Sequence, residues 1–157
     1  MSKFVLQKGS SLIEIIVAVG VMALVLTAIV ASLTLSLKTN AESEYRSQAV
    51  KRAQIAMEAF RRERTLLGWE GFSDSLRDNT TYCFQTIPAP KEAFVAGACE
   101  ATDTIVISSQ EFFREAEVVV DETVPSEPQI RVKITVSWST NDSVKDVELV
   151  QTFRKWD

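Results

Sequence analysis

The sequence contains no histidine, so it lacks the side chain that most often serves as a general base and as a metal ligand. A Gly-x-Ser-x-Gly nucleophile motif and a glycine-rich phosphate-binding loop are also missing. There is no block of like charge, and the net charge is only −4, so the charge footprint of a nucleic-acid-binding protein is absent. These absences argue against an enzyme, and they predict neither a metal site nor a cofactor.

One long stretch, Ile15–Leu37, contains no charged side chain. As a helix, this stretch of about 23 residues reaches about 34 Å, against about 30 Å of bilayer hydrocarbon. Lys3 and Lys8 precede it, and positive charge of this kind places an N-terminus in the cytoplasm. A cleaved signal peptide has a shorter apolar region followed by an A-x-A-like site, of which residues 29–31 are a poor version. We therefore expect a membrane span with the following residues exported, rather than a signal peptide or a buried core helix.

Glu14 stands almost alone at the start of this uncharged region, four residues after Ser10. A carboxylate inside a membrane helix costs roughly 2.5–3.5 kcal/mol at the helix centre, so it indicates a functional site with a specific partner. Cleavage of the chain after Gly9 would create an amino group on Ser10 that could serve as this partner. The alternative is a carboxylate that reaches the lipid headgroups and has no partner.

Glycine and proline are missing from residues 42–64, where apolar side chains recur with the period of a helix. Charged residues occupy the opposite face. The pattern predicts that the membrane helix continues as an amphipathic helix, about 55 residues in all, and that Gly68 and Gly71 end it. The apolar face consists of Tyr45, Ala49, Ala53, Ala56 and Phe60, with Val50 and Met57 beside them.

The sequence contains only two cysteines, Cys83 and Cys99, and both lie in residues 69–103, which read as an irregular connection. Two cysteines in an exported domain favour a disulfide. The bridge would close a loop of about 16 residues and contribute about 3 kcal/mol in the chain-entropy model. Two free, buried thiols are the alternative.

Short runs of β-branched and alternating residues follow, at 104–108, 116–120, 129–138 and 147–153. Tight turns between sequential strands predict an antiparallel meander. Its apolar face needs a cover, and the amphipathic half of the helix is the element available. The expected fold is α+β: a leader at 1–9, a transmembrane helix at 10–38, an amphipathic helix at 39–67, and a disulfide-containing loop with a small antiparallel sheet at 68–157.

Four aromatic residues leave two interpretations open. They could pack in the core, as aromatic side chains usually do, or form an exposed patch that recognises another protein. The four are Trp69, Phe72, Phe112 and Phe113.

The N-terminal region resembles the class III signal of bacterial type IV pilins and type II secretion pseudopilins. The resemblance is carried by residues 8–18, with the sequence KGSSLIEIIVA. It implies that a prepilin peptidase cuts after Gly9 on the cytoplasmic side and methylates the new amine of Ser10. Glu14 then becomes the fifth mature residue, and its assembly role is to pair with the amine of a neighbouring subunit. The order of helix and sheet and the two-cysteine loop also fit this family.

Within that family the chain looks most like minor subunits of the PilV-like or I-type group. Residues 131–138 and 147–152 resemble the closing hairpin of such subunits, and Ala31 stands where many major pilins have proline. Ser10 stands where the family usually has phenylalanine. The implied partners are homologous major and minor subunits, the peptidase and an inner-membrane assembly platform, with no direct contact to nucleic acid. The implied location is the inner membrane and then a pilus or pseudopilus. The alternative is a single-span anchored binding domain that does not polymerise.

Overall fold

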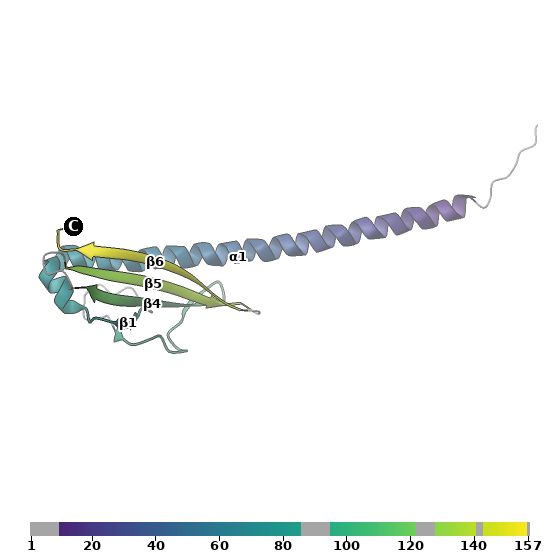
Figure 1. The fold of residues 1–157 in the computed structure, drawn as a ribbon. Coiled ribbons are helices and arrows are strands. Elements are labelled where there is room, and N and C mark those ends of the chain that lie inside the picture. Colours follow the sequence, from purple (N-terminus) through teal and green to yellow (C-terminus); the bar gives the residue numbers. More distant parts are fainter. Residues whose placement is uncertain (1–9, 86–94, 122–127, 141–142, 157) are drawn as a thin grey trace, which may run out of the picture. The chain divides into compact units, whose positions relative to one another are not determined.

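The structure is a computed structural model that describes residues 10–85, 95–121, 128–140 and 143–156; at residues 10, 11 and 95 it describes the backbone alone. The chain forms two compact units, Met1–Ser43 and Glu44–Asp157. The first unit contains the beginning of helix α1 (Ser10–Ser75), and the second contains the remainder of α1 with an antiparallel sheet (Figure 1). This α+β architecture confirms the fold class expected from the sequence.

Helix α1 continues beyond the residues where the sequence predicts its end. Gly68, with φ 67° and ψ −175°, is its one non-helical residue, and a second short helical stretch follows it to Ser75. That combination of angles is essentially restricted to glycine. The extra turns are stabilised by burial, because Phe72 is 0% exposed and Leu76, just beyond the helix, is 6% exposed. The prediction of an irregular connection over residues 69–103 is therefore wrong for residues 69–75, which are helical.

Within the described residues the sheet has six strands in the order β2-β1-β4-β5-β6, and β3 pairs with β4 outside this path. The predicted meander is confirmed for β3, β4, β5 and β6, because each of them is antiparallel to the next strand in the chain. β1 and β2 fall within the connection predicted to be irregular. β1 lies between β2 and β4 and is antiparallel to both. The strands are β1 (Thr80–Cys83), β2 (Val95–Ala96), β3 (Ile105–Ile107), β4 (Gln110–Asp121), β5 (Gln129–Ser139) and β6 (Val144–Arg154).

The amphipathic part of α1 covers the apolar face of the sheet, as the sequence predicts. Its alanines belong to the core with almost no exposure. Larger strand residues fill the space between the two layers. The core includes Ala49, Ala53, Ala56, Met57 and Phe60 from the helix, and Ile130, Val132, Ile134 and Val136 from β5.

Two arginines of α1 attach the last strand to the helix. Nε of Arg61 donates to Oε1 of Gln151 at 2.9 Å. Nη2 of Arg64 donates to the carbonyl oxygens of Arg154 at 3.2 Å and Lys155 at 3.0 Å. These bonds connect residues about ninety positions apart in sequence, so they fix β6 against the helix.

The four aromatic residues do not form one exposed patch. Phe72 and Phe112 are 0% exposed, and both belong to the core. Trp69 is partly buried against the core, where the guanidinium of Arg64 lies 5.3 Å from its ring centroid. Phe113 is half-buried. The recognition interpretation is therefore wrong for Phe72 and Phe112, whose side chains stabilise the fold.

We expect replacement of Gly68 by alanine or by asparagine to lower the free energy of unfolding by about 1–3 kcal/mol, because a side chain strains this backbone conformation. Asparagine should not be better than alanine at this position. It tolerates the left-handed helical region, whereas Gly68 combines a positive φ with ψ near 180°. Thermal unfolding of the full chain in detergent measures the loss. Leu66→Ala, at a side chain that is 70% exposed, is the control. A Gly68→Ala protein as stable as the parent would contradict this explanation of the kink.

Candidate functional site

The N-terminal turn of α1 is the first part of the candidate site. The helix begins at Ser10, and Glu14 follows one turn later on the same helix. Four residues of helix separate the two by about 6 Å along the axis. Gly9, the predicted cleavage position, lies outside the described residues. Glu14 is exposed, and its apolar neighbours Ile13 and Ile15 are 67% and 61% exposed.

An uncharged, mostly apolar surface follows Glu14. Every large apolar side chain between Leu12 and Leu37 is between 49% and 72% exposed. α1 is thus long and apolar enough to cross a membrane, and it is the one described helix that meets this criterion of length and composition. The hydroxyls of Thr27 and Thr34 donate to backbone carbonyls of the same helix, each at 2.9 Å. These internal bonds lower the cost of placing the two threonines in lipid.

The predicted disulfide is present in the structure. Cys83, the last residue of β1, joins Cys99, with the two Cα atoms 4.9 Å apart. The backbone N–H of Cys99 also donates to Oε1 of Glu115 at 2.8 Å. The bridge and this hydrogen bond together connect the segment after β2 to β1 and β4.

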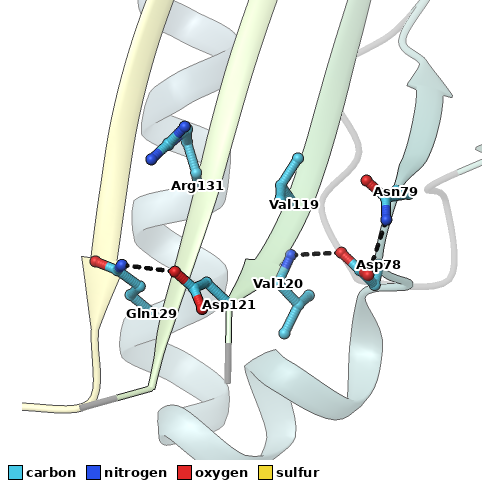
Figure 2. A pocket seen from close by; sticks show the side chains of 7 residues that line it. All are labelled: Asp78, Asn79, Val119, Val120, Asp121, Gln129 and Arg131. Carbon is cyan, nitrogen blue, oxygen red and sulfur yellow. Dashed lines mark hydrogen bonds between the residues drawn. The ribbon is translucent and has the colours of Figure 1, made fainter. Parts of the chain in front are cut away.

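A surface hollow of about 370 Å³ lies where α1 leads into β1, beside the ends of β4 and β5 (Figure 2). Its carboxylates accept hydrogen bonds from neighbouring groups of the chain. Asp78 accepts from the backbone N–H of Val120 at 2.8 Å and from the side-chain amide of Asn79 at 3.0 Å. Asp121 accepts from the amide of Gln129 at 3.1 Å. The hollow is open to solvent on the sheet, and its hydrogen bonds fix the turn between α1 and β1.

The face of the sheet opposite the core is charged and solvated. Nζ of Lys133 lies 2.6 Å from a carboxylate oxygen of Glu117 and 3.9 Å from one of Glu148. The hydrogen bond to Glu117 and then its negative charge raise the pKa of Lys133 above its usual value. Within the described ranges, no group of three or more histidine, cysteine, aspartate or glutamate side chains could hold a metal ion.

Sequence reasoning missed two buried charged residues, Glu63 of α1 and Arg114 of β4, which are 4% and 2% exposed. In β4, side chains alternate between the two faces of the sheet, and Arg114 faces the core together with Phe112 and Ala116. The alternation of residues 110–121 is a signal that could have found Arg114, because it places this arginine on the core face of a strand. Arginine is rarely buried, so its presence at such a position indicates an unusual site.

Comparison of the chain with protein-family models, with curated proteins and with solved structures finds no significant match. The sequence-predicted residues fall into two groups, which lie in different units. Ser10, Glu14 and the apolar surface belong to the first unit, and the disulfide belongs to the second.

We expect Leu26→Arg to reduce membrane insertion, because an arginine at the centre of a span raises the free energy of insertion by about 2.5–3.5 kcal/mol. The matched control is Leu66→Arg, which places the same charge on the amphipathic part of the same helix. Leu26 and Leu66 are 62% and 70% exposed. The measurement is the fraction of protein that resists carbonate extraction from membranes. Equal extraction of the two variants would contradict a membrane span at Ile15–Leu37.

We expect the double substitution Cys83→Ser and Cys99→Ser to lower the free energy of unfolding by about 3 kcal/mol, because the reduced chain regains the entropy of an open loop. Chemical denaturation of the full chain in detergent tests this, with Ser108→Ala, at an exposed turn residue, as the control. A loss of less than about 0.5 kcal/mol, the ordinary effect of a surface substitution, would show that the bridge contributes little.

Proposed function

We propose that this chain is a minor pilin or pseudopilin, a structural subunit of a type IV pilus-like or type II secretion filament, and that a prepilin peptidase processes it after Gly9. The observation that carries the proposal is Glu14, an acidic residue in the second turn of a helix whose following residues, 15–37, carry no charge and expose large apolar side chains. A carboxylate in that position is costly in lipid unless a cation neutralises it.

Solvation explains how the proposed subunit would assemble. Lipid is already apolar, so burial of hydrophobic side chains does not drive helices together in a membrane; close packing and satisfied polar groups do. Cleavage after Gly9 creates an amine on Ser10, one helical turn from Glu14. In a filament, the amine of one subunit neutralises the Glu14 carboxylate of its neighbour, and this pairing sets the axial register.

The second unit fits the role of a domain displayed outside the membrane. Its two cysteines are bridged, which suits an oxidising compartment. Helix α1 runs through both units, so a subunit that enters a filament through the first unit brings the second unit with it. Under this proposal the N-terminus is cytoplasmic, the second unit is exported, and the partners are homologous subunits, the peptidase and the inner-membrane assembly platform.

We expect Glu14→Leu to leave membrane insertion intact and to reduce incorporation into filaments by about tenfold or more, which corresponds to about 1.4 kcal/mol of lost pairing. The matched control is Glu44→Leu, an exposed glutamate on the same helix beyond the apolar stretch. Quantitative immunoblotting of sheared filaments and of membranes gives both fractions.

Two results would contradict the proposal. One is normal incorporation of the Glu14→Leu protein, which would remove the assembly role of this residue. The other is a chain that keeps Met1 and never enters a filament, as expected for a single-span anchored binding domain.

A further inference from the structure

Arg114 is a cation in the hydrophobic core of the second unit. It lies in β4 between Phe112 and Ala116 on the core face, opposite Val136 of β5, and only 2% of it is exposed. Transfer of a guanidinium from water into such surroundings is costly unless other groups replace the lost hydration. The burial of Arg114 therefore requires nearby groups that accept hydrogen bonds from its guanidinium.

Two backbone carbonyls replace part of the lost water. Nε of Arg114 donates to the carbonyl of Phe84 at 3.1 Å, and Nη2 donates to that of Gln85 at 3.5 Å. The N–H of Phe84 donates in return to the carbonyl of Arg114 at 3.0 Å. Among the described residues, no carboxylate bonds to this guanidinium. Burial, and secondly the positive charge of Arg52, lower the pKa of Arg114 to about 10.

The disulfide lies next to both partners of this contact, residues 84–85 and strand β4. Cys83 immediately precedes Phe84 and Gln85, so the bridge anchors the start of the segment whose carbonyls receive the guanidinium. The other cysteine, Cys99, is held by the side chain of Glu115, which follows Arg114 in β4. The bridge thus adds a covalent link at the point where the β1–β4 ladder ends, at the pair Cys83 and Glu115, directly before residues 84–85.

We propose that the Cys83–Cys99 disulfide is a redox-sensitive latch that keeps the Arg114 guanidinium buried. Reduction by a dithiol breaks the S–S bond and forms two cysteine thiols, while the two thiols of the reductant become a disulfide. Residues 84–85 then lose their covalent link and are held by noncovalent contacts, among them the burial of Phe84 and the hydrogen bond from Gln85 to Asp103. Their carbonyls leave Arg114, and the guanidinium returns to water. The segment after β1 consequently covers Arg114 stably only under oxidising conditions. This inference does not require the chain to form filaments.

Phenylglyoxal, which modifies accessible guanidiniums, tests the latch on the full chain in detergent. Peptide mass spectrometry follows Arg114, the exposed Arg131 and the partly buried Arg64, which contacts the end of β6 away from the bridge. In the oxidised protein we expect Arg114 to react much more slowly than Arg131. After reduction and capping of the thiols, we expect the rate at Arg114 to rise about tenfold or more through local opening. The rates at Arg64 and Arg131 should change less than about twofold.

The Cys83→Ser and Cys99→Ser double variant should match the reduced protein without any capping reagent. Unchanged protection of Arg114 in the reduced protein would overturn the proposal, because the carbonyls would then hold the cation without the bridge. A parallel rise at Arg64, or a red shift in the fluorescence of the buried Trp138, would also overturn it. Either result would show that reduction loosens the whole unit instead of releasing Arg114.

Discussion

The packing of the alanine face of α1 against the sheet is the contact on which the second unit depends. Ala49, Ala53 and Ala56 are at most 1% exposed. The branched side chains of β5 fill the remaining space. Because interiors are packed as densely as organic crystals, a larger residue at any of these alanines would separate the layers.

The same helix meets two different environments. In the second unit its alanine face is covered by the sheet, whereas in the first unit its leucine, isoleucine and valine side chains are exposed around the helix. An apolar surface that is exposed on every side needs lipid or other helices as its surroundings. Glu14 makes the requirement more specific, because a carboxylate in that surface also needs a cation. The proposed assembly through neighbouring N-termini satisfies both needs with one contact.

Long periodic segments were predictable, and short segments stabilised by tertiary contacts were not. The amphipathic pattern of residues 45–60 and the alternation of residues 130–138 each persist long enough to specify an element. The helical turns after Gly68 follow a residue that usually ends a helix, and they exist because Phe72 reaches the core. β1 is four residues long and pairs with a strand beyond the next two in sequence, so no local pattern marks it. At the candidate site, the sequence located Glu14 and the cysteine pair, but it did not show that Arg114 is buried beside the bridge.

The central claim is that a new amine on Ser10 neutralises the carboxylate of Glu14, and the mass of the N-terminus tests it most directly. The full chain would be expressed in cells with an active prepilin peptidase, purified from their membranes, and analysed by intact-protein and N-terminal peptide mass spectrometry. The account predicts a chain that begins at Ser10, with or without one methyl group on its amine. A chain that retains its first nine residues would contradict it, because the amine that Glu14 requires would not exist.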